Sequence, residues 1–146
     1  MRYAKLIISI LAFLFIDLIT KYFFYDNWFL FNSKFIDPIL NFGISRSIPI
    51  PIFLTILISI IWIILFIFVY QRKYAWRLIV GLLVAWTLGN LIDRICLGWV
   101  RDFINIQIRN FPIFNFADVF LNVWIIIFIL KEIFFLKKQN KRIHSD

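Results

Sequence analysis

Four long apolar runs constrain the fold of this chain more than any other feature. They cover residues 6–24, 50–70, 78–95 and about 117–136, and the segment around the second run, IPIPIFLTILISIIWIILFIFVY, carries no charge. A hydrocarbon layer about 30 Å thick requires roughly 20 apolar residues in a helix, which is about the length of each run. Because backbone groups cannot stay unpaired in lipid, every run is predicted to be helical.

Composition supports the same fold class. Of the 146 residues, 63% are hydrophobic, which leaves too little polar surface to cover a water-soluble globule. We therefore predict an all-α integral membrane protein, with one domain over residues 1–146, four transmembrane helices and a small extended or loop region outside the membrane. The first run could be a cleavable signal peptide, but it lacks a small-x-small cleavage site and continues into Asp17 and Lys21, so a permanent anchor is expected.

The basic residues predict how the helices are oriented. They precede the first run, link the second to the third, and follow the fourth: Arg2, Lys5, Arg72, Lys73, Arg77, Lys137, Lys138, Lys141 and Arg142. Since positively charged segments stay in the cytoplasm, both termini should lie inside, and residues 25–49 and 96–116 should lie outside. The net charge of +8 thus follows topology rather than forming one basic face, which disfavours nucleic-acid binding.

The acidic residues gather at one predicted face of the membrane. Six of the eight lie at or beyond the outer ends of the runs: Asp17, Asp26, Asp37, Asp93, Asp102 and Asp118. Ionisable groups at membrane depth are costly, so each is a candidate functional residue.

Two of these carboxylates have basic neighbours in the sequence. Asp17 and Lys21 are four residues apart, so they can pair on one helical face, either as an interfacial anchor or as part of a site. Asp93 and Arg94 are adjacent and point about 100° apart on a helix, so they need partners on other helices. Asn90, three residues before Asp93, can share its face.

Asp102 and Asp118 are the strongest candidates for chemistry. Asp102 lies in the alternating stretch GWVRDFINI, which could be extended, and Asp118 opens the fourth run. If the segment between them folds back, two carboxylates meet in a low-dielectric site and share a proton, which provides the acid and the base for amide hydrolysis. Singly, Asp118 could be a helix N-cap and Asp102 a solvated loop charge, although Asn115 could cap the helix instead.

Other chemistries have weaker support. A Ser/Lys peptidase could use Ser45 or Ser47 with Lys21, but no helical S-x-x-K motif is present. The only histidine, His144, lies on the predicted inner side, and no HExxH motif or histidine cluster offers a metal site. A membrane protein without catalysis, whose buried charges only hold helices together, is the alternative from another class.

Five segments taken together resemble a known family. DLITK at 17–21, NFGIS at 41–45, GNLIDR at 89–94, GWVRDFI at 98–104 and FNFAD at 114–118 are similar, in order and topology, to the sequence blocks of the lipoprotein signal peptidases (signal peptidase II). The resemblance covers nearly the whole chain. It implies an aspartyl endopeptidase of the bacterial inner membrane, without metal or cofactor, that works near the periplasmic face. It further implies cleavage of prolipoproteins before the cysteine that carries a diacylglyceryl group.

The resemblance also implies roles for individual residues. Asp102 and Asp118 correspond to the catalytic pair of the family. The substrate-binding or supporting residues would be Asp17, Lys21, Asn41, Gly43, Asn90, Asp93, Arg94 and Asn115. The expected partners are diacylglyceryl-modified prolipoproteins, membrane lipids and the inhibitor globomycin. The chain departs from the family pattern at Arg46, Val119 and Trp124, which concern loop packing and helix packing near the site.

Overall fold

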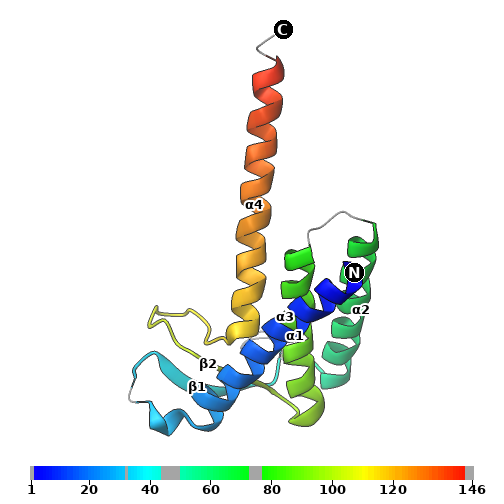
Figure 1. Cartoon of the computed structure of the whole chain (residues 1–146). Helices are drawn as coiled ribbons and strands as arrows, with labels where there is room; N and C mark the ends of the chain where they lie inside the picture. Colours follow the sequence, from blue (N-terminus) through cyan, green and yellow to red (C-terminus); the bar gives the residue numbers. More distant parts are fainter. Residues whose placement is uncertain (1, 32, 44–49, 73–76, 144–146) are drawn as a thin grey trace.

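The computed structural model describes residues 2–31, 33–43, 50–72 and 77–143. Within these ranges the chain forms the α-helices α1 (Arg2–Lys21), α2 (Ile52–Gln71), α3 (Arg77–Cys96) and α4 (Phe116–Ile143), shown in Figure 1. Ser45, Arg46, Ser47 and His144, which entered the sequence-based hypotheses, lie outside the described residues.

The helices follow the predicted apolar runs closely. The bounds of α2 and α3 agree with prediction within two residues, whereas α1 begins at Arg2 rather than at residue 6. After α1 the chain continues into a π-helical turn, η1 (Tyr22–Asp26), and a 3-10 turn, η2 (Trp28–Leu30). Helix α4 ends at Ile143 rather than at residue 136, because the lysine, glutamine and arginine residues after the apolar run favour helix without needing lipid.

Helix α3 lies at the centre of the bundle. It packs against α1, α2 and α4, and nearly all of its residues from Ile79 to Leu91 are at least half-buried. Figure 1 shows α1 crossing in front of α3, with α2 and α4 on either side. The central position explains why the polar residues of α3 can contact several other elements.

The other helices turn large apolar side chains outward. Helix α2 exposes Phe53, Leu57, Ile61 and Ile64. Over the described residues, three segments are long and apolar enough to cross a membrane: Tyr3–Asp26, Ile52–Gln71 and Arg77–Cys96. An apolar outer surface is stable in lipid, whereas in water it would promote aggregation. The protein is thus mostly helical with apolar spans. That α4 is a fourth span, and that both termini lie inside, stay predictions.

A two-stranded antiparallel sheet lies at one end of the bundle (Figure 1). Strand β1 (Ile36–Asn41) pairs with β2 (Val100–Ile104), with Ile39 opposite Asp102. The register shifts between Ile36 and Ile39, where Pro38 has no N–H to donate to a ladder. The prediction that the stretch around Asp102 is extended is confirmed.

The segment after β2 folds back onto it. The backbone N–H groups of Phe103 and Ile104 donate to the carbonyl of Phe114 at 3.1 and 2.8 Å, and the N–H of Phe114 donates to Ile104 at 3.2 Å. The reversal uses Gln107 and Asn110 at positive φ. It brings the start of α4 beside β2, as the sequence predicted.

Candidate active site

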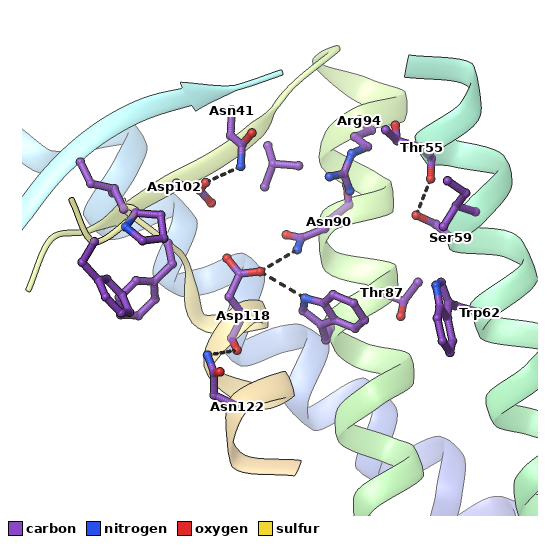
Figure 2. Close-up of a pocket in the computed structure, with 17 residues that line it drawn as sticks. Asn41, Thr55, Ser59, Trp62, Thr87, Asn90, Arg94, Asp102, Asp118 and Asn122 are labelled. Carbon is purple, nitrogen blue, oxygen red and sulfur yellow. Dashed lines mark hydrogen bonds between the residues drawn. The ribbon is translucent and has the colours of Figure 1, made fainter. Parts of the chain in front are cut away.

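A cavity of about 400 Å³ lies where the sheet meets the ends of α2, α3 and α4. Asp102 from β2 and Asp118 from α4 both line it, as Figure 2 shows. Its other polar lining side chains are Asn41, Thr55, Ser59, Thr87, Asn90, Arg94 and Asn122. Trp62 and Trp86 add aromatic surface. The cavity therefore joins a polar end to a more apolar wall.

The alternation of β2 places Asp102. Neighbouring strand residues point to opposite faces, so Asp102 lines the cavity while Arg101 points away from it. Two amides hold the carboxylate: Asn41 donates from Nδ2 to Oδ2 at 2.8 Å, and Asn115 donates from Nδ2 to Oδ1 at 2.7 Å. Asp102 is therefore held in position at both oxygens.

The first turn of α4 places Asp118. The N–H of Asp118 donates to Asn115 Oδ1 at 3.1 Å, and the N–H of Asn115 donates back to Asp118 Oδ2 at 3.1 Å. This reciprocal arrangement has the pattern of a capping box, with Asn115 as the cap. The expectation that Asn115 could cap the helix is confirmed. The second oxygen, Oδ1, accepts hydrogen bonds from Trp86 Nε1 at 3.2 Å and Asn90 Nδ2 at 3.4 Å.

The orientation of the side-chain amides of Asn41, Asn90 and Asn115 is determined by partners that can only donate hydrogen bonds. The side-chain oxygen of Asn90 accepts from Lys21 Nζ at 3.2 Å. The oxygens of Asn115 and Asn41 accept from backbone N–H groups. Because an ammonium or a backbone N–H can only donate, each amide must present its NH₂ group to a carboxylate.

The two carboxylates, which we call the carboxylate pair, are therefore surrounded by hydrogen-bond donors. Asp102 is only 2% exposed. Burial, and next the negative charge of Asp118, raise the pKa of Asp102 to about 7, against the lowering effect of the Asn41 and Asn115 hydrogen bonds. Near neutral pH, Asp102 can therefore both hold and release a proton, as a general acid requires.

A second group of charges lies beside the cavity, and we call it the ion cluster: Asp17, Lys21, Asp26, Asp93 and Arg101. Lys21 Nζ lies 2.8 Å from Asp17 Oδ2 and 3.1 Å from Asp93 Oδ2. Both Asp17 and Lys21 are fully buried. The predicted pair therefore exists at the end of α1, and it is buried inside the protein.

Arg101 extends the ion cluster to the turn after α1. Its guanidinium contacts Asp93 at 2.9 Å and Asp26 at 2.6 Å, and its backbone N–H donates to Asp93 at 3.0 Å. The partners that Asp93 required are therefore Lys21 and Arg101. Arg94 points elsewhere, as predicted: it lines the cavity and donates from Nη2 to the carbonyl of Gly43 at 3.2 Å.

The ion cluster also positions α4. Asp17 Oδ1 accepts a hydrogen bond from the N–H of Ala117 at 2.9 Å, one residue before Asp118. Gly89 leaves room for this contact, because a Cβ at that position would collide with the Asp17 carboxylate. The cluster thus connects α1, α3, β2 and α4 directly beneath the carboxylate pair.

The structure brings the predicted residues together in two layers. Asn41, Asn90, Arg94, Asp102 and Asp118 line the cavity. Asn115 links the two carboxylates from beneath, Gly43 contributes backbone groups, and the remaining predicted residues, Asp17, Lys21 and Asp93, belong to the ion cluster.

Sequence reasoning missed several contributors, among them Arg101 of the ion cluster. Trp86 lies four residues before Asn90 and so shares its helical face, a spacing that could have revealed it. Thr55 and Ser59 have the same spacing in an otherwise apolar helix and are both buried. Of the departures from the family pattern, Val119 is half-buried in the first turn of α4 and Trp124 packs against the apolar cluster that includes Leu6 and Val80.

Solved structures with a similar fold indicate the class of protein to which this chain belongs. Two structures, each described as a bacterial membrane enzyme, share 26% sequence identity with this chain. One has a TM-score of 0.73 and covers 89% of this chain and 88% of its own. The other has a TM-score of 0.70, with 88% and 92% covered. The fold is therefore that of a small bacterial membrane enzyme.

The family follows from the sequence comparisons. The family model described as signal peptidase (SPase) II matches residues 9–134, and this chain belongs to that family. A lipoprotein signal peptidase of Wigglesworthia glossinidia brevipalpis is 33% identical over 143 aligned residues, covering 87% of this chain and 93% of that protein. The resemblance on which the sequence analysis relied is confirmed.

Some relatives match over a shorter region. The lipoprotein signal peptidase of Lactiplantibacillus plantarum is 42% identical over 60 residues, covering 41% of this chain and 40% of that protein. That of Microcystis aeruginosa is 48% identical over 50 residues, covering 34% and 32%. The chain therefore spans less than half the length of these two relatives in the alignments.

Proposed function

We propose that this chain is an aspartyl endopeptidase that removes signal peptides from diacylglyceryl-modified prolipoproteins, cleaving before the lipidated cysteine. The observation that carries the proposal is the carboxylate pair. Asp102 and Asp118 line one cavity and together accept five N–H hydrogen bonds. Membership of the signal peptidase II family supplies the substrate class.

The pair can hydrolyse a peptide bond with water alone. One carboxylate takes a proton from water as the water oxygen bonds to the scissile carbonyl carbon, and the protonated partner donates to the carbonyl oxygen. When the tetrahedral intermediate collapses, the C–N bond breaks and the leaving amine receives the proton first taken from water. One hydroxyl of the intermediate returns its proton to the partner carboxylate as the new C=O bond forms. The raised pKa of Asp102 keeps a proton available near pH 7. Neither step requires a metal or a cofactor.

The surroundings of the pair suit a substrate that arrives from the bilayer. The cavity adjoins apolar helices, so acyl chains can stay in lipid while the scissile bond reaches the polar end. Arg94 and the amides of Asn41 and Asn90 line that end and can hold substrate carbonyls. With the basic segments inside, the site lies near the periplasmic face of the inner membrane, where a globomycin-type inhibitor would also bind.

The contacts of Lys21 disfavour a Ser/Lys mechanism. Such a mechanism needs an amine that is free to act as a base, but the amine of Lys21 is buried and contacts two carboxylates and an amide oxygen. Lys21 is also absent from the cavity lining. A membrane protein with purely structural charges would match the ion cluster, but it would not explain the family membership or the carboxylate pair.

Single replacement of the two carboxylates tests the proposal. Asp102→Asn and Asp118→Asn should each lower the rate of cleavage of a lipidated prolipoprotein by about 10²- to 10⁴-fold, because general acid–base catalysis is lost. Asp37→Asn is the matched control, since Asp37 is exposed on β1, accepts a hydrogen bond from Asn105 Nδ2 at 3.0 Å and does not line the cavity. Cleavage is followed by gel shift in detergent. Undiminished cleavage by either site variant would refute the carboxylate pair.

A further inference from the structure

Trp86 contacts the carboxylate pair, although it lies outside the five segments that carry the family resemblance. It lies on α3 one turn before Asn90, and its indole Nε1–H donates to Asp118 Oδ1 at 3.2 Å (Figure 2). An indole N–H is a donor only, so this hydrogen bond exists only while the oxygen presents a lone pair.

Three donors converge on Asp118. Trp86 and Asn90 share Oδ1, and the N–H of Asn115 occupies Oδ2 at 3.1 Å. The Asn90 amide cannot rotate to become an acceptor here, because Lys21 Nζ requires its oxygen on the other side. Asp118 also lies in the first turn of α4, where the positive end of the helix dipole favours an anion. Asp102 accepts only two of the five hydrogen bonds and is almost completely buried.

The indole ring is held in place by its own packing. Trp86 lies against an apolar cluster formed by Leu82, Ala85 and Phe120, so one edge of the ring is anchored in the bundle while the N–H faces the cavity. An aromatic side chain with a polar edge is suited to this position between core and cavity. The donor therefore has a determined direction and does not depend on solvent.

We propose that Trp86 is a positioning residue that holds Asp118 as the unprotonated member of the carboxylate pair, so that Asp118 accepts the proton of the attacking water while Asp102 carries the proton given to substrate. This inference rests on the proposed function and adds to it which carboxylate acts as the base and which as the acid. Among the described residues, the other charged groups near the pair include Arg94 on α3, which lines the cavity, and Lys21 on α1, which reaches it through Asn90. Asp17 on α1 accepts from the N–H of Ala117, one residue before Asp118.

The test removes the donor while keeping the ring. Trp86→Phe deletes the N–H, and site-specific incorporation of benzothienylalanine at position 86 replaces the N–H by sulfur in a ring of the same shape. Both should lower kcat by about tenfold or more, the effect of losing a hydrogen bond to a charged acceptor. KM should stay within about twofold, because the lost interaction acts on the pair rather than on bound substrate.

The pH profile separates positioning from packing. Without the indole donor the unprotonated form of the pair is less favoured, so the acid-side limb of the kcat profile should move up by as much as about one pH unit. Trp28→Phe, in the exposed 3-10 turn after η1, serves as the control and should keep the wild-type profile. Comparable far-ultraviolet spectra and thermal unfolding in detergent would show that the variants are folded.

Each outcome decides the inference. A lower kcat and a moved acid limb in the benzothienylalanine protein support it. An unchanged profile in that protein overturns it, even if Trp86→Phe is slow, because the ring shape would then be what matters. Loss of the proposed function gives a different pattern, in which the wild-type chain fails to cleave or Asp118→Asn cleaves normally.

Discussion

The carboxylate pair and the ion cluster lie side by side, yet their charges are compensated in opposite ways. In the ion cluster, Lys21 and Arg101 contact carboxylates directly at 2.6 to 3.1 Å. Among the described residues, neither member of the carboxylate pair forms an ion pair, and both receive neutral N–H donors instead. Direct cations stabilise ionised aspartates, whereas amides orient a carboxylate and still allow it to hold a proton.

This difference separates structure from chemistry. Asp17 and Asp93 join helices through their contacts with Lys21, whereas burial raises the pKa of Asp102 to about 7. Asn90 connects the two regions, since its oxygen accepts from Lys21 and its NH₂ group donates to Asp118. The cation thus orients the site without contacting the pair.

The largest expected effect comes from removing the central cation. Lys21→Met leaves Asp17 buried without its partner, and breaking a buried ion pair from one side typically costs about 3–5 kcal/mol. The variant should unfold at markedly lower temperature in detergent, as followed by circular dichroism, and should lose activity. Adding Asp17→Asn should recover part of the stability, because the uncompensated charge is then gone. Wild-type stability in Lys21→Met would mean that the ion cluster is not structural.

A smaller effect is expected where α3 passes the ion cluster. Gly89→Ala places a methyl group against the Asp17 carboxylate, and such overpacking typically costs about 1–3 kcal/mol. Gly81→Ala on the same helix is the control. Its Cβ would meet Ser9 Oγ at 3.0 Å, a small side chain that can move more easily. Thermal unfolding should therefore rank wild type above Gly81→Ala and Gly81→Ala above Gly89→Ala; equal stability of the two variants contradicts the close contact.

At the carboxylate pair, removing a charge should raise the stability of the protein rather than lower it. The pKa of Asp102 is raised from 3.8 to about 7 on folding, so the folded protein binds this proton more tightly than the unfolded chain. By linkage, wild-type stability should fall as pH rises from about 4 to 7 and level off above, a loss that Asp102→Asn avoids. At pH 8 the Asp102→Asn variant should be more stable than wild type by about 1–2 kcal/mol. This is less than the full pKa shift corresponds to, because the new NH₂ group faces a hydrogen-bond donor.

Thermal unfolding at pH 5 and pH 8 measures this effect. The advantage of Asp102→Asn should be larger at pH 8, whereas Asp37→Asn, on the exposed face of β1, should change stability by less than about 0.5 kcal/mol. If Asp102→Asn were less stable than wild type at pH 8, the charge of Asp102 would be stabilised by its surroundings, as the carboxylates of the ion cluster are by Lys21 and Arg101.

Much of the site was predictable from spacing and order along the chain. The separation of four residues between Asp17 and Lys21 predicted their pairing, and the angle between Asp93 and Arg94 predicted that each needs distant partners. The alternating stretch around Asp102 indicated that it could be extended, and the short loop between the third and fourth runs indicated that it could fold back. The structure shows both features. The roles implied for Asp102 and Asp118 came from the family resemblance rather than from spacing.

Other features depended on contacts between distant segments. The spacing of Trp86 to Asn90 indicates a shared helical face, but only the packing of α4 beside α3 places the indole N–H against Asp118. Arg101 was not a candidate from the sequence, and it joins the ion cluster because the strand turns it away from the cavity and toward Asp93. Lys21 and Asn90 are 69 residues apart, and no periodicity relates them.

The sequence by itself determined that this chain forms long apolar helices, because lipid offers no partners for an unpaired backbone and leaves helix as the way to bury such runs. It also determined that carboxylates gather at one end of those helices. Only the tertiary structure decided which carboxylates contact cations and which contact amides. The physical reason is that a charge's state depends on atoms within a few ångströms, and packing of distant segments, not sequence order, brings those atoms together.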